Sequence, residues 1–192
     1  MTPALLFSSP TIVVFDTEYT AWEGSREAKW KRPGEYREIV QIGAVLLDTR
    51  VYSEKASFDV FIKPKRNPEL SDYFSRLTGI TQHTIDHEGV DFSDAITRFF
   101  SWAGTHDLYS FGSDAEVLEE NCRLCEIPFP FDRMRFKDIR ALFDARGIPA
   151  YSYTSGTIVT AFGEALVRPP HNALNDSRTI VDGLRLLAKI NE

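Results

Sequence analysis

The chain has 192 residues, of which 43% are hydrophobic and 26% are charged. This length favours one domain (1–192) with a substantial core, and the composition gives no indication of disorder. The formal net charge of −6 argues against a broad basic surface for tight nucleic-acid binding. It leaves open an enzyme with an acidic metal centre, because bound divalent ions reverse the sign of the local field.

The cysteine content and the hydropathy exclude several other classes. Cys122 and Cys125 are too few for zinc, which requires about four ligands, and their helical spacing favours buried core thiols over a redox pair. No apolar stretch approaches the roughly 18–20 residues of a membrane span, and residues 1–10 carry no basic residue before their apolar part, unlike a signal peptide. We therefore expect a soluble, cytoplasmic protein.

The predicted elements begin with three strands. Residues 11–15 form an apolar run rich in β-branched side chains, and residues 38–47 and 57–62 follow as two further strands with polar links. This order predicts an antiparallel meander. Residues 19–37 are predicted to form a long connection without an element of its own.

The remainder of the chain is predicted to be mainly helical. In chain order we expect short helices at 70–77 and after the turn at 78–81, an amphipathic helix at 91–102, a strand at 106–111, a helix at 114–126, a strand-to-helix or helical segment at 136–146, and helices at 155–166 and 173–190. Strands first and mainly helices afterwards, with one later strand, indicate a layered α/β or α+β architecture.

Two carboxylates directly follow the first apolar run. Asp16 and Glu18 are two positions apart, so in an extended chain they point to the same face. Buried charges are tolerated when they are paired or metal-bound, and hard oxygen ligands suit Mg²⁺ or Mn²⁺. The alternative is that the strand ends at Phe15 and both acids are solvated, so this pair alone is a weak indication of a metal site.

Two more acids fall on the apolar faces of their predicted helices. Asp176 lies four residues before Ile180, and Asp114 lies three and four before Val117 and Leu118. Taken separately, each is more simply explained as a first-turn acid that complements the helix dipole. Together with the strand pair they make four inward-facing carboxylates, a set that two divalent ions about 3.5–4 Å apart could neutralise while clamping a phosphodiester.

His171 lies close to this set. It follows two prolines in an extended segment just before the helix that holds Asp176, so both side chains can reach one site. A neutral histidine there could take a proton from a water molecule acidified by metal ions. Taken alone, a helix cap or a surface position is the simpler interpretation.

Three motifs formed by these residues resemble those of the DEDDh family of 3′–5′ exonucleases. They are FDTE at 15–18, FGSD at 111–114 and HNALND at 171–176, and their order and the H-x₄-D spacing match over nearly the whole chain. Residues 61–64, 67–72 and 77–82 are similar to the Eri-1-like branch, whose members trim the 3′ ends of histone mRNA, small RNAs or ribosomal RNA. The set of three motifs is highly specific, whereas any one of them is not.

The resemblance implies an α/β, ribonuclease-H-like fold with a five-stranded mixed sheet flanked by helices. It also implies an enzyme that hydrolyses single-stranded RNA or DNA from the 3′ end to 5′-mononucleotides by a two-metal mechanism. Asp16, Glu18, Asp114 and Asp176 would hold two Mg²⁺ ions, which Mn²⁺ could replace, and His171 would deprotonate the attacking water.

Substrate contacts are expected in two places, after the first strand and in the turn at 77–80. The residues expected to bind the terminal nucleotide or to stack on a base are Thr17, Tyr19, Trp22, Leu77, Thr78 and Ile80. Stacking by Trp22 would contribute about 1–3 kcal/mol, and the alternative is that it packs on the domain. Tyr19 is bulkier than the Ala or Thr often found in the family, which is expected to narrow the nucleotide pocket.

Other interpretations remain open. A non-catalytic module that binds 3′ ends or a protein partner would ordinarily lack one of the five site residues, and none is missing here. An endonuclease or a small-nucleotide phosphodiesterase is a third possibility. The expected partners are the 3′ ends of single-stranded RNA or DNA. A preference for one of the two would depend on contacts to the 2′-hydroxyl group, which the sequence does not assign to particular residues. We expect a monomer.

Overall fold

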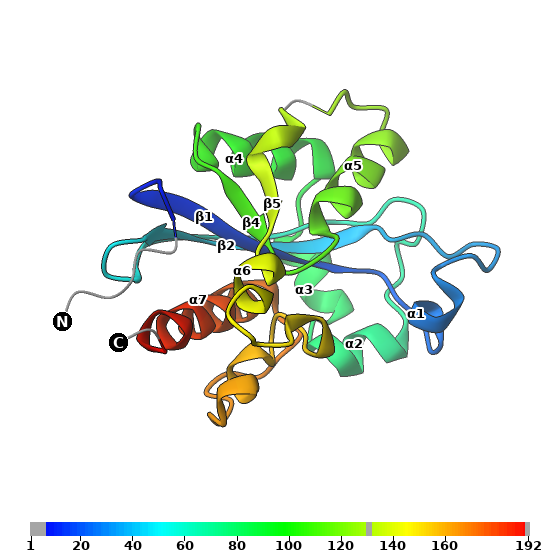
Figure 1. The fold of residues 1–192 in the computed structure, drawn as a ribbon. Helices are drawn as coiled ribbons and strands as arrows, with labels where there is room; N and C mark the ends of the chain where they lie inside the picture. Colours follow the sequence, from blue (N-terminus) through cyan, green and yellow to red (C-terminus); the bar gives the residue numbers. More distant parts are fainter. Residues whose placement is uncertain (1–6, 130–131, 191–192) are drawn as a thin grey trace.

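The computed structural model describes residues 7–129 and 132–190, and at its centre lies a mixed sheet in the order β3-β2-β1-β4-β5 (Figure 1). The strands are β1 (Thr11–Tyr19), β2 (Ile39–Asp48), β3 (Ser53–Phe61), β4 (Leu108–Ser110) and β5 (Phe136–Asp138). The first three strands form an antiparallel meander, and β4 and β5 continue the sheet in parallel with β1. The predicted meander and the five-stranded mixed sheet are confirmed.

β1 is buried on both faces because its side chains alternate between two hydrophobic cores. Val14 packs in one core with α7 (Ala173–Lys189), whereas Val13 and Phe15 pack in the other with α4 (Phe92–Ala103) and α5 (Asp114–Leu124). Figure 1 shows α7 on one side of the sheet and α4 with α5 on the other. The continuous apolar sequence before Asp16 therefore reflects a central strand covered by helices on both faces.

The remaining helices are short. They are α1 (Ser25–Ala28), α2 (Asp72–Thr78), α3 (Gln82–Glu88) and α6 (Arg140–Asp144), with 3₁₀ turns at Arg133–Arg135, Ala150–Ser152 and Ile158–Phe162. None of the helices in the described ranges combines the length and the apolar character that a membrane span requires. Residues 1–6, which belong to the segment used above to argue against a signal peptide, lie outside the described residues.

One alternative and two local predictions are wrong. β1 continues through both acids to Tyr19, because its pairing with β2 extends that far, so the strand does not end at Phe15. The β1–β2 connection contains the short helix α1, which the Trp22 backbone N–H supports by donating to Oγ of Ser25. Residues 155–166 form only a 3₁₀ turn at Ile158–Phe162, and a left-handed glycine ends this turn directly afterwards.

The start of α7 lies directly against β2. Gly43 permits this approach, because a Cβ atom there would lie 2.1 Å from the backbone nitrogen of Leu174. The hydroxyl group of Ser177 donates a 2.9 Å hydrogen bond to the carbonyl oxygen of Gly43. Gly43 is the partner of Asp16 in the β1–β2 register. Because Asp176 lies in the first turn of α7, the close contact places it near the acids of β1.

The cysteines lie in the core opposite α7. Cys122 is buried and Cys125 is partly buried, and both thiols are free. Burial raises the pKa of Cys122 to about 11, so its thiol stays protonated and unreactive at neutral pH. The interpretation of core thiols is confirmed for Cys122.

Candidate active site

A cavity of about 590 Å³ opens beside the C-terminal half of β1. It is lined by all five residues that the sequence grouped together, namely Asp16, Glu18, Asp114, His171 and Asp176. They come from β1, from the first residue of α5, and from the first turn of α7 with the segment before it. Residues 16 and 176 are thus brought together from opposite ends of the chain.

Three of the acids form one cluster. Asp16, Glu18 and Asp176 each place a carboxylate oxygen within 4.8 Å of the others. The strand period of two puts Asp16 and Glu18 on the face of β1 that α7 covers. Asp176 is 3% exposed and lies on the inner face of α7, as its spacing from Ile180 predicted.

Asp114 approaches β1 from the α5 side and is held there by Thr17. The backbone N–H and the hydroxyl group of Thr17 both donate to Oδ1 of Asp114, at 3.1 and 2.7 Å. Thr17 lies between Asp16 and Glu18 in the strand, so its side chain points to the other face. The residue expected to bind substrate therefore also fixes the orientation of one of the acids.

Burial raises the pKa values of all four acids, and repulsion within the cluster raises those of Asp16, Glu18 and Asp176 further. For Asp16 the causes are burial first and then the charges of Asp114, Asp176 and Glu18, and for Glu18 they are burial and the charges of Asp176 and Asp114. Burial raises the pKa of Asp114 and of Asp176 to about 6. No ion pair within the described part of the chain involves any of the four. Arg26, Arg37 and Arg140 line the same cavity, but none of them forms a direct ion pair with the cluster.

One oxygen of Asp176 shows that the cluster fits a metal ion. Oδ2 of Asp176 accepts hydrogen bonds from the His171 backbone N–H at 3.2 Å and from the Ser155 hydroxyl group at 3.3 Å. Oδ1 is buried and has no hydrogen-bond partner among the described residues. An unsatisfied buried carboxylate oxygen costs stability unless a cation binds it, and an all-oxygen donor set suits a hard divalent ion.

The backbone of His171 is fixed in an uncommon conformation. Its φ angle is +65°, in the left-handed region, while its N–H donates to Asp176. Asn172 and not His171 caps α7, since its side chain accepts a hydrogen bond from the Asn175 N–H. The helix-cap interpretation of His171 is therefore wrong. Burial and the nearby charge of Arg26 lower the pKa of His171, which favours the neutral imidazole.

The structure divides the residues expected to contact substrate. Tyr19, Trp22 and Leu77 line the cavity together with Thr17, whereas Thr78 and Ile80 do not. The hydroxyl group of Thr78 instead donates to the Phe74 carbonyl oxygen and accepts from the Ile80 N–H. Ile80 is 4% exposed and packs in a small core with Phe74. Thr78 and Ile80 thus shape the turn beside the cavity.

Several lining residues were not identified from the sequence. They are Ala21, Ser25, Arg26, Trp30, Arg37, Tyr73, Phe74, Arg140, Tyr151, Tyr153, Thr154 and Ser155. The neighbouring Gly156 is equally informative, because a Cβ atom there would lie 2.6 Å from Oδ1 of Asp176. In the sequence, Gly156 lies among a serine and two threonines, a composition that indicates a turn, although the segment was predicted to be helical.

Comparisons with known proteins identify the family of this chain. The exonuclease family RNase_T matches residues 13–184. Human 3′-5′ exoribonuclease 1 is 28% identical over 181 residues, which cover 88% of this chain and 50% of that protein. The 3′-5′ exonuclease Snipper of Drosophila melanogaster is 34% identical over 91 residues, which cover 47% of this chain and 31% of that protein.

A solved structure shows the same fold. The nuclease domain of 3′hExo, a DEDDh family member bound to rAMP, matches with a TM-score of 0.80 and 26% identity over 95% of this chain and 94% of that chain. The ribonuclease-H-like fold class and the resemblance to the Eri-1-like DEDDh enzymes are confirmed. The chain spans about half the length of the human relative. It belongs to the RNase_T exonuclease family.

Proposed function

We propose that this domain is a metal-dependent 3′–5′ exonuclease that releases 5′-mononucleotides from the 3′ ends of single-stranded RNA or DNA. One observation carries the proposal. Four carboxylates that form no ion pair with any described residue converge on one cavity, and three of them are buried while Glu18 is partly buried. A half-buried histidine whose pKa is lowered lines the same cavity. A module that only binds nucleic acid gains nothing from an unneutralised acidic cluster, because such a cluster repels phosphates.

The acidic cluster is the proposed metal site. Asp16, Glu18 and Asp176 would hold divalent cations together with Asp114, with Mg²⁺ as the expected ion, two per chain, and Mn²⁺ as a substitute. Such ions, when bound, neutralise the acids, acidify water and stabilise the negative charge of a phosphodiester under attack. The unsatisfied Oδ1 of Asp176 supports this assignment.

In the proposed reaction, a residue of the chain accepts the proton of the attacking water. A water oxygen attacks the phosphorus of the last phosphodiester, and a ring nitrogen of His171 accepts the proton of that water. The bond from phosphorus to the 3′ oxygen of the preceding nucleotide breaks, and that oxygen takes a proton from solvent, to which His171 returns the proton that it accepted. The terminal nucleotide leaves as a 5′-monophosphate. The lowered pKa of His171 keeps its ring able to accept a proton at neutral pH.

The apolar side of the cavity is the proposed site of the terminal nucleotide. Tyr19, Trp22 and Leu77 line it, and Tyr19 is fixed by edge-to-face packing on Trp30 with ring centroids 5.3 Å apart. Two structures similar to this chain are described as bound to rAMP and as recognising the 3′ end of a histone mRNA stem-loop. These descriptions favour RNA as the first substrate to test. A monomeric, cytoplasmic protein stays a prediction.

The test is a parallel degradation assay on 5′-labelled single-stranded RNA and DNA, with Mg²⁺, Mn²⁺ or EDTA. We expect a ladder that shortens from the 3′ end only with metal, and chromatography should identify nucleoside 5′-monophosphates. Asp176→Asn serves as the inactive control. Internal cleavage products, or no metal-dependent shortening on any strand, would contradict the proposal. Tight binding of 3′ ends without cleavage would favour the non-catalytic alternative.

A further inference from the structure

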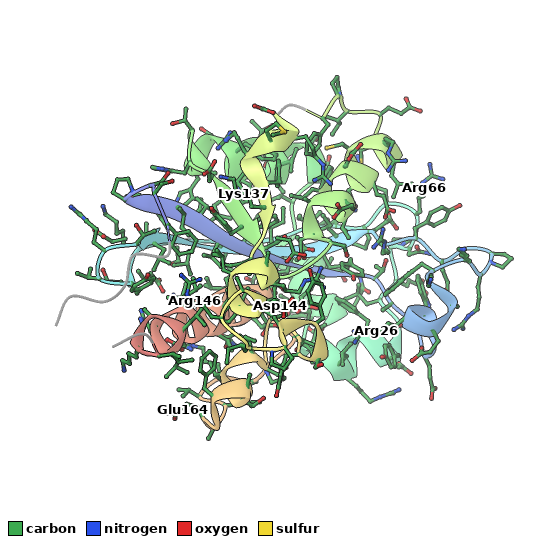
Figure 2. The ribbon with its side chains drawn as sticks, viewed as in Figure 1. Arg26, Arg66, Lys137, Asp144, Arg146 and Glu164 are labelled. Carbon is green, nitrogen blue, oxygen red and sulfur yellow. The ribbon has the colours of Figure 1, made fainter. Side chains whose placement is uncertain are left out.

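A second cavity of about 420 Å³ adjoins the active-site cavity, and the two share Trp30 and Arg37 as lining residues. The second cavity is bounded by the β1–β2 connection, by α5 and by the segment that contains Arg66. Figure 2 shows Arg66 and Arg26 at the same end of the molecule, which is the end where Figure 1 places α1 and α5. A single-stranded nucleic acid that leaves the active-site cavity past Trp30 would therefore enter this second cavity.

The second cavity is basic although the chain carries a net charge of −6. Its charged lining residues are Lys29, Arg37, Arg66 and Arg123 with Glu35 and Glu120. Glu120 accepts two hydrogen bonds from Arg37. Glu35 forms an ion pair with Arg32 through Oε1, whereas its Oε2 is buried without a hydrogen-bond partner among the described residues. Among the described residues, no carboxylate pairs with the side chains of Lys29, Arg66 or Arg123.

Aromatic rings stand beside these cations. The guanidinium group of Arg66 lies 5.0 Å from the ring centroid of Tyr36, and that of Arg37 lies 5.9 Å from the ring centroid of Trp30. Tyr36 is 37% exposed, so part of its ring is available to a ligand. Cations for the backbone together with aromatic faces for the bases are the combination by which proteins bind single-stranded nucleic acids.

The backbone between the two cavities is held in an unfavourable conformation. Lys29 and Trp30 both have φ angles of +52°, a left-handed geometry uncommon for residues other than glycine. The indole N–H of Trp30 donates to the Thr20 carbonyl oxygen, and its backbone N–H donates to the Ser25 carbonyl oxygen, each at 2.9 Å. These contacts fix Trp30 at the boundary of the cavities. Conformations of this kind cluster at functional sites.

We infer that the second cavity binds the part of a single-stranded nucleic acid that lies 5′ of the nucleotide in the active-site cavity. Lys29, Arg66 and Arg123 contact its phosphates, and Trp30 and Tyr36 offer faces for its bases. The volume lies within the roughly 300–1,000 Å³ typical of ligand sites. This inference rests on the proposed exonuclease function and extends it from the terminal nucleotide to the strand behind it.

The test measures binding without turnover, by fluorescence anisotropy of labelled oligonucleotides of increasing length in EDTA. The variant is Arg66→Glu/Arg123→Glu, in which both changed side chains are exposed. Arg146→Glu/Lys189→Glu is the matched control, because it changes the net charge equally, and Figure 2 shows Arg146 away from Arg66. Should the reversal variant fail to fold by circular dichroism, Arg66→Ala/Arg123→Ala replaces it.

We expect wild-type affinity to rise with length until the strand fills the second cavity, and the cavity variant to bind long strands about tenfold or more weakly. Loss of two phosphate contacts should lower the slope of log affinity against log salt by about 1.4. The control variant should behave as wild type. Cleavage of a p-nitrophenyl ester of a nucleoside 5′-monophosphate, which occupies only the active-site cavity, should be unchanged in the cavity variant.

Equal loss of affinity in both double variants would show that the effect comes from the net charge of the protein and not from the second cavity, and it would overturn the inference. Unchanged binding in the cavity variant would also overturn it. Displacement of the oligonucleotide by an acidic peptide of equal charge and at equal concentration would identify an acidic protein segment as the occupant instead. Failure of the exonuclease proposal is recognised separately, because the small ester would then not be cleaved by the wild-type protein.

Discussion

The hydroxyl group of Thr17 donates a 2.7 Å hydrogen bond to Oδ1 of Asp114, across 97 positions of sequence. Thr17 stands between Asp16 and Glu18 in β1, so the strand that supplies two acids also orients a third through the residue between them. β1 is therefore the frame of the site on both of its faces. Hydrogen bonds of this type, which orient metal-binding groups, strongly influence metal affinity.

Thr17→Val removes the hydroxyl donor while keeping the shape of the side chain. We expect the affinity for Mg²⁺ or Mn²⁺ and the cleavage rate to fall by about 10–100-fold, because Asp114 loses one of its two Thr17 donors. Thr17→Ser, which keeps the hydroxyl, should remain near wild type. Calorimetric metal titration of both variants measures the effect. Equal metal affinity in Thr17→Val and wild type would show that the hydrogen bond does not support the site.

Gly156→Ala places a methyl group 2.6 Å from Oδ1 of Asp176 and 2.7 Å from Cβ of Pro170. We expect Asp176 to be displaced and metal affinity to fall by about tenfold or more, with the fold retained. Ser152→Ala, an exposed change in the same segment, is the control. Near-wild-type metal affinity in Gly156→Ala would mean that Asp176 can move without loss, against its proposed role.

The metal-free protein should lose stability as the pH rises from about 4 to 7. The pKa of Asp114 and of Asp176 is raised to about 6 by burial, against about 3.9 in an unfolded chain. Between these values the folded state binds more protons than the unfolded state, so the free energy of unfolding falls with rising pH. Groups with a lowered pKa act in the opposite sense. Glu54 beside Arg178 does so at lower pH, and His171 does so below the ordinary histidine value of about 6.5, which partly offsets the two aspartates.

Thermal unfolding in EDTA across this pH range measures the effect, at ~2–4 °C for each kcal/mol. Asp114→Asn should show a flatter dependence, and Mg²⁺ should restore stability at pH 7 because it binds only the folded site. A wild-type protein that becomes more stable between pH 5 and 7 without metal would contradict the proposed electrostatics of the cluster.

His171 should set the acidic limb of the pH–rate profile. Because burial and Arg26 lower the pKa of His171, the rate should reach half its maximum below the ordinary histidine value of about 6.5. Removal of the positive charge in Arg26→Ala favours the protonated ring and should move this limb to higher pH. His171→Gln should reduce turnover by about 10²–10⁴-fold and abolish the limb. Near-normal rates in His171→Gln between pH 6 and 8 would exclude the general-base role.

The central strand and the final helix could be predicted because the spacing of apolar residues along each segment indicates which side chains are buried. The apolar run before Asp16 marked a strand covered on both faces, and Ile180, Leu184 and Leu187 marked the buried stripe of α7. Asp176 stood out because it shares that stripe. Both predictions depend only on the order of apolar and polar residues along the chain, which can be read directly from the sequence.

Contacts made through the fold could not be predicted in this way. The hydrogen bond from Ser155 to Asp176 and the close approach of Gly156 arise because a turn, and not a helix, occupies that segment. Likewise, the pairing of Thr17 with Asp114 depends on where α5 meets β1. Such tertiary relationships have no local pattern, so only the three-dimensional arrangement reveals them.

The most direct test of the metal centre is a calorimetric titration of Mn²⁺ into the metal-free wild-type protein and its Asp16→Asn variant at pH 7. Asp16 is buried beside three other acids, and burial followed by the charges of these acids raises its pKa. We predict two Mn²⁺ ions per wild-type chain, and at least one ion lost or bound about tenfold more weakly in the variant. Undetectable Mn²⁺ binding to the wild type, or identical binding by the two proteins, would contradict a metal centre built from these acids.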